Sequence, residues 1–242
     1  MNDTTINKTP FKDVLTQLKL FLNEDPLKFA SLKECCADIG EEFIKRNPKT
    51  SEELDKFYDE SNTYCYENSY WNSKGVCKRR FSSYIKVLNE YNIKDLLEIG
   101  IGNGSNAISF ALNGFNVTVT RSRDLAFRFF EYRLKTFYPQ LKIKIIDSLN
   151  DIDRISCICH FDVVEHVLDP YSFMDATLSK CDYTLFVHAF NVHTPELGGY
   201  PQHFDINVSK FFDYIKNKGF EKIRIKAFFP PIFFKKVKLK NE

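Results

Sequence analysis

Three glycines at alternate positions, placed between an apolar run and a helical pattern, constrain the fold of this chain most. The stretch is "DLLEIGIGNGSNAISFAL", residues 95–112. Its apolar run ends at Glu98, the glycines stand at positions 100, 102 and 104, and helical spacing follows. Glycine lets a backbone take unusual dihedral angles and pass close to a ligand. A glycine-rich turn between a strand and a helix predicts a nucleotide-binding α/β domain.

Strand-like and helical patterns alternate from residue 94 onward. Such alternation predicts a Rossmann-like α/β fold, an open and mostly parallel sheet with helices on both faces. The last two strands follow one another through Pro230 and Pro231, which predicts a hairpin that adds an antiparallel C-terminal edge. We expect strands at 94–100, 115–120, 141–147, 154–161, 183–190, 221–229 and 232–240, and helices at 105–114, 124–137, 170–181 and 207–220.

The first 90 residues have a different character. Helical spacing at 11–22, 31–45 and 78–91, and a helix start near Pro48, predict an N-terminal helical cap over residues 1–90 and a core over 91–242. The segment from Tyr58 to Trp71 is rich in aromatic residues. Two interpretations stay open for it: a lid over the binding site, or a packing face between the cap and the sheet.

Composition excludes several classes of protein. The chain has 242 residues and a net charge of +2, which argues against a nucleic-acid substrate. No apolar stretch reaches the roughly 18 residues of a membrane span, and the N-terminus lacks the apolar core of a secretory signal. Seven cysteines without a C-x-x-C pair fit a cytoplasmic protein, and Cys157 and Cys159 fit core positions. A homo-oligomer is compatible with these data. The basic run "KKVKLK" (235–240) predicts a solvated edge strand.

The glycine turn alone does not identify the nucleotide. The dinucleotide fingerprint G-x-G-x-x-G fails from Gly100, because residue 105 is serine, and from Gly102 it ends at Ala107. Glu98, two residues before the first glycine, would repel a pyrophosphate. A ligand with positive charge would suit this carboxylate better.

Several motifs together resemble one family. "EIGIGNG" (98–104) matches E/D-x-G-x-G-x-G, and "FDVVEHVLDP" (161–170) looks like an E-H-V/I-x-D-P segment. The run 199–225 is similar to the family's approach to its last two strands. Over about residues 91–239 the chain resembles class I S-adenosylmethionine (SAM)-dependent methyltransferases, in particular the small-molecule subgroup that includes ubiquinone-biosynthesis-type enzymes.

The resemblance implies SAM as cofactor and a set of residues that bind it. The glycine turn would lie against the methionine part, Glu98 would organise the site around the ammonium group, and Asp147 would contact the adenine amino group. The cofactor-binding residues expected on this basis are Glu98, Gly100, Gly102, Gly104, Asn106, Thr120, Arg121, Asp147, Ser148 and Asp162. For Asp162, a helix N-cap is the alternative interpretation.

One position departs from the family pattern. Where the family has an acid for the ribose hydroxyls, after the second strand, this chain has Thr120, Arg121 and Ser122. These residues could hold the ribose in another way. Alternatively, Arg121 or Arg123 could bind the 2′-phosphate of NADP in an oxidoreductase. A non-catalytic nucleotide-binding module is the third possibility.

The expected reaction moves a methyl group to oxygen or nitrogen of a small-molecule acceptor, and such an acceptor needs a base. The candidate bases are His166, His188, His193 and His203, whereas His160 fits a core position. Candidate substrate-binding residues are Tyr64, Tyr70, Asn191 and Tyr200. We expect no metal site, because the spacing of His188, His193 and His203 matches no familiar metal motif.

Overall fold

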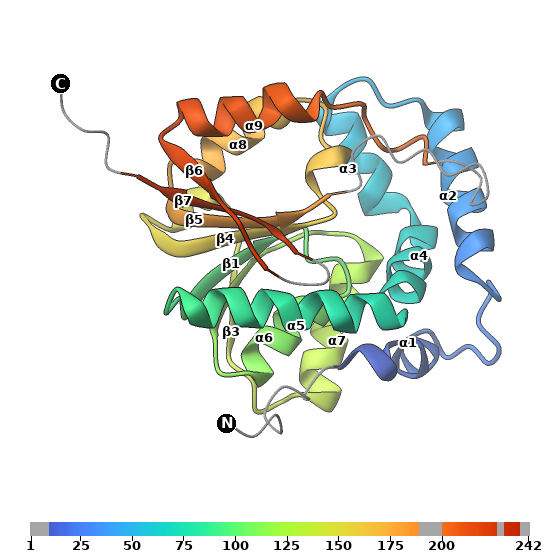
Figure 1. Ribbon diagram of the computed structural model, residues 1–242. Coiled ribbons are helices and arrows are strands. Elements are labelled where there is room, and N and C mark those ends of the chain that lie inside the picture. The colour runs from blue at the N-terminus through green and yellow to red at the C-terminus, as the bar shows by residue number, and fades with distance from the viewer. Residues whose placement is uncertain (1–9, 189–199, 227–229, 238–242) are drawn as a thin grey trace.

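The computed structural model describes residues 10–188, 200–226 and 230–237 and contains a seven-stranded sheet (Figure 1). The strand order is β3-β2-β1-β4-β5-β7-β6. The first five strands are parallel, and β7 is antiparallel to both β5 and β6. The predicted fold class is therefore confirmed. The bounds are β1 Asp95–Ile99, β2 Asn116–Thr120, β3 Ile143–Ile146, β4 Ile155–Phe161, β5 Cys181–Val187, β6 Phe220–Ile223 and β7 Ile232–Lys236.

The prediction for the basic C-terminal run was wrong on one point. Lys235 and Lys236 lie on β7, which pairs with β5 on one side and β6 on the other. The edge strand is β6, which precedes β7 in sequence. The charge of a segment does not show which of the two hairpin strands pairs with β5. That pairing depends on which side chains the two strands bury against the helices.

Helices cover both faces of the sheet (Figure 1). On one face lie α5 (Gly75–Glu90), α6 (Ser105–Leu112) and α7 (Leu125–Phe137); on the other lie α8 (Pro170–Leu178) and α9 (Val208–Asn217). Alternate residues of one strand serve the two cores, since Leu96 packs with the first group and Leu97 with the second. The short 3-10 helices are η1 (Pro10–Lys12), η2 (Leu149–Asp151) and η3 (Val164–His166).

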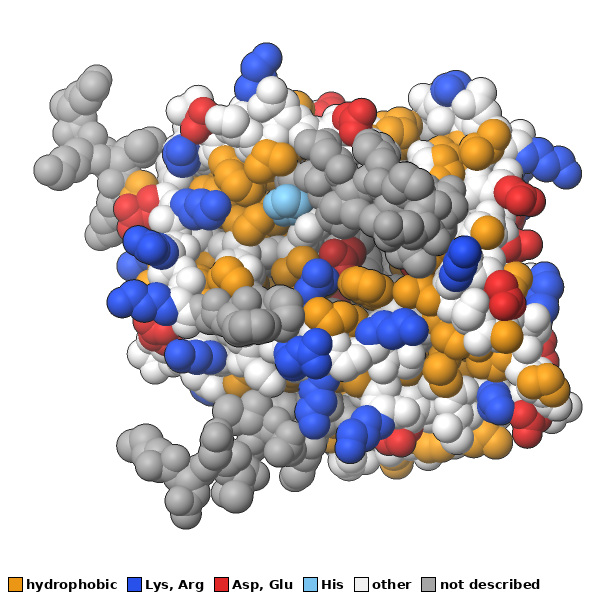
Figure 2. Space-filling view, turned by 45° about the vertical axis from the view of Figure 1, so that its right-hand side comes forward, with side chains coloured by type: hydrophobic (Ala, Val, Ile, Leu, Met, Phe, Trp, Pro, Cys, Tyr) orange, Lys and Arg blue, Asp and Glu red, His pale blue; other side chains and the backbone are white. Residues whose placement is uncertain are grey.

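The surface carries mixed charges, as Figure 2 shows for one face. Lys and Arg side chains alternate there with hydrophobic side chains, and acidic atoms lie recessed near the centre of the view. Within the part of the chain that the structure describes, none of the helices is both long enough and apolar enough to cross a membrane.

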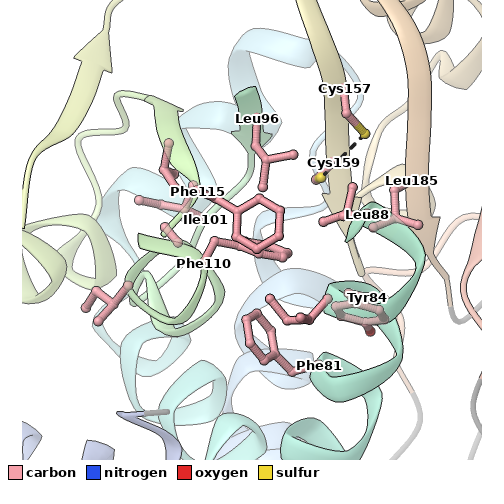
Figure 3. Close-up of a cluster of buried hydrophobic side chains, with 14 of the residues drawn as sticks. Phe81, Tyr84, Leu88, Leu96, Ile101, Phe110, Phe115, Cys157, Cys159 and Leu185 are labelled. Carbon is pink, nitrogen blue, oxygen red and sulfur yellow. Dashed lines mark hydrogen bonds between the residues drawn. The ribbon is translucent and has the colours of Figure 1, made fainter. Parts of the chain in front are cut away.

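The larger core cluster is aromatic and sits between α5, α6 and the sheet (Figure 3). The Phe81 and Phe110 rings lie 4.8 Å apart, and Tyr84 stacks on Phe161 at 4.6 Å. Cys157 and Cys159 are fully buried beside them, which confirms their predicted core positions. Helix α5 ends at Glu90 and shares this core with the sheet, so its packing does not separate residues 1–90 from the rest of the chain. The domain boundary near residue 90 stays a prediction.

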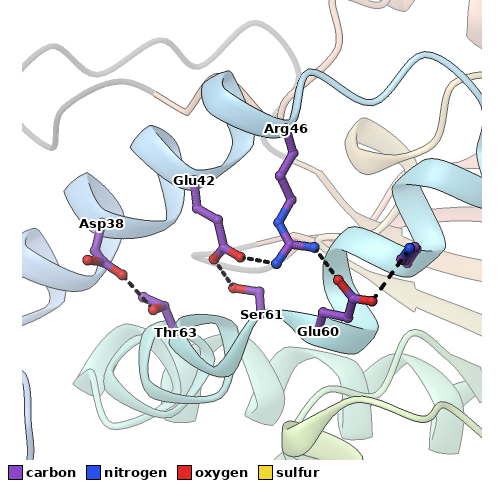
Figure 4. A network of polar contacts seen from close by, with 7 residues as sticks. Asp38, Glu42, Arg46, Glu60, Ser61 and Thr63 are labelled. Atoms are coloured by element: carbon purple, nitrogen blue, oxygen red, sulfur yellow. Dashed lines mark hydrogen bonds and ion pairs between the residues drawn. The ribbon is translucent and has the colours of Figure 1, made fainter.

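The remaining helices belong to the predicted cap region 1–90 and are called the cap helices below: α1 (Val14–Leu22), α2 (Leu32–Arg46), α3 (Ser51–Glu60) and α4 (Asn62–Asn72). Polar contacts join α2 to the junction of α3 and α4 (Figure 4). Arg46 bridges the carboxylates of Glu42 and Glu60 at 2.8 and 2.6 Å. Ser61 donates to Glu42 and Thr63 donates to Asp38, both at 2.6 Å. These contacts fix where α4 lies relative to the rest of the cap.

Candidate functional site

The glycine turn follows β1 and leads into α6. Gly102 has a φ of 52° and Gly104 a φ of 71°, the left-handed region that side chains disfavour. A Cβ on Gly102 would lie 2.5 Å from the side chain of Asn68, and a Cβ on Gly104 would lie 2.1 Å from the Phe130 ring. Gly100 is equally constrained, with a φ of 69° and Val163 at 2.6 Å. Glycine is therefore required here for both conformation and space.

Glu98 lies near the end of β1, just before this turn, and its side chain is 2% exposed. Burial raises the pKa of its carboxyl from 4.5 to about 8, while a hydrogen bond from Asn106 on α6 opposes the rise. The oxygen Oε2 has no hydrogen-bond partner among the described residues. An unpartnered buried carboxyl oxygen is costly unless a ligand supplies a donor, and a cation is the natural complement.

Asn103, between the last two glycines, is fully buried and links the turn to the cap. Its backbone N–H donates to Asn68 Oδ1 at 2.9 Å, and its Nδ2 donates to Ser69 Oγ at 3.3 Å. Its Oδ1 accepts from the Ser105 hydroxyl at 2.6 Å and from Arg133 Nη1 at 3.2 Å. The glycine turn is thus held by α4 from the cap and by α7 from the core.

Arg121 follows β2 and is paired with carboxylates. Its Nε lies 2.7 Å from Asp147 Oδ1, and its Nη1 lies 3.2 Å from Glu131 Oε1. Thr120 ends β2 and pairs with Ile146 of β3. Ser148 caps η2 by accepting from the Asn150 N–H at 3.1 Å. The predicted residues Thr120, Arg121, Asp147 and Ser148 therefore meet at the ends of β2 and β3.

Asp124 caps α7 and accepts from the Phe127 N–H at 2.6 Å. Ser122 donates its hydroxyl to the same carboxylate at 2.5 Å. Asp124 is 6% exposed, and burial raises its pKa. An acid does lie buried near the end of β2, three residues beyond the expected place, where the local structure uses it as a cap.

Asp162 follows β4 with a φ of 54° and lies 3.7 Å from Arg80 on α5. The N-cap of the following 3-10 helix is Val163, so the alternative interpretation of Asp162 as a helix cap was wrong. Burial raises the pKa of Asp162, whereas Arg80 and a hydrogen bond from Trp71 lower it. Glu67 of α4 faces this carboxylate. Burial and then the charge of Asp162 raise the pKa of Glu67 to about 7.

His166, at the end of η3, belongs to a buried cluster of aromatic and imidazole rings. Its Nδ1 lies 2.8 Å from the hydroxyl of Tyr58 on α3. The His203 ring is 4.5 Å away, and Tyr200 stacks on His203 at 4.7 Å. Burial, and then His203, lower the pKa of His166 to about 3, while a hydrogen bond to the Gln202 backbone opposes this. The imidazole is neutral at physiological pH.

Other predicted residues lie elsewhere. His188, just after β5, has its ring 6.3 Å from Phe212 on α9, and burial and Lys222 lower its pKa to about 4. Tyr70 donates its hydroxyl to the Phe29 carbonyl at 2.5 Å, inside the cap. Tyr64 stands beside Tyr58 at 5.2 Å between ring centroids. The structure thus places Tyr64 and His166 against Tyr58, with His203 against His166 and Tyr200 against His203, while His188 and Tyr70 contact other groups. His193 and Asn191 lie outside the described residues.

The sequence interpretation did not single out Asn68, Asn103, Arg133 or Glu67. Asn103 stands inside the glycine motif and could have been noticed as its only amide. The other three lie in or near helices at least 30 residues away from the turn. Helical spacing alone does not show which side chains of a cap helix face a distant turn. Among the residues that the structure describes, no group of three potential metal ligands occurs.

No family model matches the chain, and no curated protein matches it. Solved structures do. Magnesium protoporphyrin IX methyltransferase (ChlM) from Synechocystis PCC 6803 with bound SAM is 11% identical, with a TM-score of 0.53, over 87% of this chain and 100% of that chain. A SAM-dependent methyltransferase from Clostridium acetobutylicum ATCC 824 is also 11% identical, with a TM-score of 0.50, over 71% of this chain and 99% of that chain. The chain has the fold of class I SAM-dependent methyltransferases.

Proposed function

We propose that the protein transfers a methyl group from SAM to an oxygen or nitrogen atom of a small-molecule acceptor. The buried carboxyl of Glu98 beside the glycine turn is the observation that supports this most. Its Oε2 has no hydrogen-bond partner within the described part of the chain, and SAM carries an ammonium group that would supply one. The similar structures from Synechocystis contain SAM or S-adenosylhomocysteine (SAH), which agrees with this assignment.

The residues present fit the cofactor along its length. The glycine turn would receive the methionine part, Glu98 would accept from its ammonium group, and Asn106 would orient the Glu98 carboxylate. Thr120 and Ser122 would face the ribose, with Asp147 and Ser148 toward the adenine. When bound, SAM supplies a methyl group on a sulfonium that is open to in-line attack.

The acceptor side would be formed by Asp162 and by the Tyr58–His166 pair. In the tautomer with the proton on Nε2, Nδ1 of His166 would accept the hydrogen bond from the Tyr58 hydroxyl 2.8 Å away. An acceptor hydroxyl or ammonium could then give its proton to the Tyr58 oxygen, while Tyr58 gives its own proton to His166 Nδ1. The carboxylates of Glu67 and Glu165, whose charges raise the Tyr58 pKa, would stabilise the resulting imidazolium.

The cap would contribute by excluding water. Tyr58 and Tyr64 come from α3 and α4, and burial raises the pKa of the Tyr200 hydroxyl, which keeps this side chain neutral. A methyl transfer depends mainly on alignment and on a dry site, so a cap that supplies aromatic walls serves this chemistry. The predicted lid role of the segment from Tyr58 to Trp71 is part of this proposal.

The test is calorimetric titration with SAH, followed by transfer of a labelled methyl from SAM to panels of phenols, carboxylic acids and amines. We expect saturable, one-to-one SAH binding. Tyr58→Phe should keep the SAH dissociation constant within about twofold and lower kcat by about a hundredfold or more, as loss of acid–base assistance does. A parent protein that does not bind SAH would contradict the proposed function. An unchanged kcat in Tyr58→Phe would remove only the proton-accepting pair.

A further inference from the structure

Arg133 of α7 is the largest side chain that is fully buried in the described structure. A buried guanidinium is normally paired with a carboxylate, because removing a charge from water is costly. Among the described residues, no carboxylate lies within ion-pair distance of Arg133, although the Tyr138 side chain and the charge of Asp13 act to raise its pKa. Burial lowers the pKa of this guanidinium to about 10, so it stays charged at neutral pH despite the cost.

The donors of Arg133 are directed at the glycine turn. Nη1 donates to the backbone carbonyl of Asn103 at 2.7 Å and to the Ser105 hydroxyl at 2.9 Å. Nε donates to Gln17 Oε1, on α1 of the cap, at 2.8 Å. The remaining amino group, Nη2, has no hydrogen-bond partner in the described residues. One buried cation therefore joins the cap, the core and the turn.

The turn needs such an external support. Its glycines have positive φ values and no side chains, and the backbone of the turn closes one hydrogen bond of its own, from Gly104 N–H to the Ile101 carbonyl at 2.9 Å, which leaves the Asn103 carbonyl to an outside donor. The Asn103 carbonyl belongs to the peptide that precedes Gly104, and its bond to Arg133 fixes the plane of this peptide. Asn68 holds the N–H on the other side of Asn103. Together these bonds set the shape of the surface on which a ligand would rest.

We propose that Arg133 is a positioning residue that holds the Asn103 peptide in the shape required to receive the methionine part of SAM. The role rests on the proposed function, since it assumes that the turn carries this part of the cofactor. Arg133 acts through Asn103. Its bond to Gln17 also makes the shape of the turn depend on the placement of α1.

The experiment compares two ligands that differ in the part resting on the turn. SAH has the amino-acid portion, whereas 5′-methylthioadenosine has the same adenosine without it. Calorimetry is performed with the parent, Arg133→Met, Arg133→Lys and Arg128→Met. Arg128 lies on the same helix and is exposed, which makes it the matched control. Methionine fills similar space without charge, and such replacements of buried ions are often tolerated by the fold.

We expect Arg133→Met to weaken SAH binding by about tenfold or more, as loss of a charged hydrogen bond does, with the affinity for 5′-methylthioadenosine within about twofold. Arg133→Lys should recover part of the loss, and Arg128→Met should match the parent. Unchanged SAH binding in Arg133→Met would overturn the proposal. Equal losses for both ligands would also overturn it, because they would indicate general damage to the fold.

Hydrogen exchange separates this proposal from the proposed function. Backbone amides at 101–108 should exchange about tenfold faster in Arg133→Met than in the parent, while those of α9 stay unchanged. Unchanged exchange at the turn would overturn the positioning role even if the parent bound no SAH. If Arg133→Met does not fold, Gln17→Leu removes the partner of Nε together with the hydrogen bond from Gln17 Nε2 to the Tyr138 hydroxyl, and it leaves both bonds of Nη1 in place. It should weaken SAH more than 5′-methylthioadenosine, and equal affinities would overturn the proposal.

Discussion

The side-chain oxygen of Asn68 accepts a hydrogen bond from the Asn103 N–H at 2.9 Å and so joins cap helix α4 to the glycine turn. The same carboxamide packs on Gly102, where an added Cβ would lie 2.5 Å from Oδ1. The cap is therefore in contact with the turn itself.

Gly102→Ala should destabilise the protein and impair SAH binding. The left-handed conformation alone costs about 1–2 kcal/mol for a non-glycine residue, and the clash with Asn68 adds to it. Gly114→Ala is the matched control, because Gly114 has a φ of 81° but no atom within 4 Å of an added Cβ. Chemical denaturation should show a larger loss for Gly102→Ala, and calorimetry should show lost SAH binding for this variant only.

Asn68→Ala in the Gly102→Ala background should recover part of the stability. Equal stability losses at both glycines would contradict the contact with Asn68.

Glu98→Gln should weaken SAH binding by about tenfold or more, since it removes the charge that faces the ammonium group. In the free parent the Glu98 carboxyl is mostly protonated at pH 7, because burial raises its pKa to about 8. Binding of a cation would ionise it, so SAH binding at pH 7 should release about one proton. Calorimetry in buffers of different ionisation enthalpy measures this number. Release of no proton by the parent would contradict the assignment of Glu98.

The same substitution has an opposite effect on the free protein. A carboxyl whose folded pKa lies above its unfolded value stabilises the fold below pH 4.5, and this contribution is lost as pH rises to about 8. Glu98→Gln should therefore gain stability relative to the parent between pH 4.5 and 8. Denaturation curves at several pH values measure the gain, and a constant difference between the two proteins would show that Glu98 titrates normally.

Arg121→Ala should change little. Both ion pairs of Arg121 involve a side chain that is 45% exposed, and exposed pairs contribute about 0–1 kcal/mol. Asp147 and Glu131 also occupy the guanidinium that an NADP 2′-phosphate would need. We expect SAH affinity within about twofold of the parent and no heat on titration with NADP. NADP binding that Arg121→Ala abolishes would favour the oxidoreductase instead.

His160→Leu should stabilise the protein. Both ring nitrogens of His160 are buried without a hydrogen-bond partner in the described residues, a cost of about 1–3 kcal/mol that leucine avoids. Burial lowers the pKa of His160 to about 3. A histidine kept neutral in the fold contributes stability above pH 6.5 that is lost as pH falls to about 3. Over this pH range, the free energy of unfolding of His160→Leu should fall less steeply than that of the parent in acid denaturation. The buried His166 accounts for part of the slope that remains. An unchanged slope would contradict the burial of a neutral His160.

The alternation of strands and helices after residue 94 was predictable from the sequence because each signal is local. Hydrophobic periodicity and the three glycines depend on neighbouring residues, and so does the carboxylate at Glu98. These features determined the fold class and the place of the glycine turn. The same reasoning did not predict that β7 inserts between β5 and β6, which depends on contacts between distant strands.

Only the tertiary structure decided which distant residues meet the site. Asn68, Tyr58 and Arg133 reach Asn103, His166 and the turn across separations of 35, 108 and 30 residues. Burial in the folded chain also sets the protonation of Glu98 and His166, since desolvation changes a pKa only after the chain has folded around the group. The sequence determined the residues available for the chemistry. Packing determined which of them lie together and in which charge state.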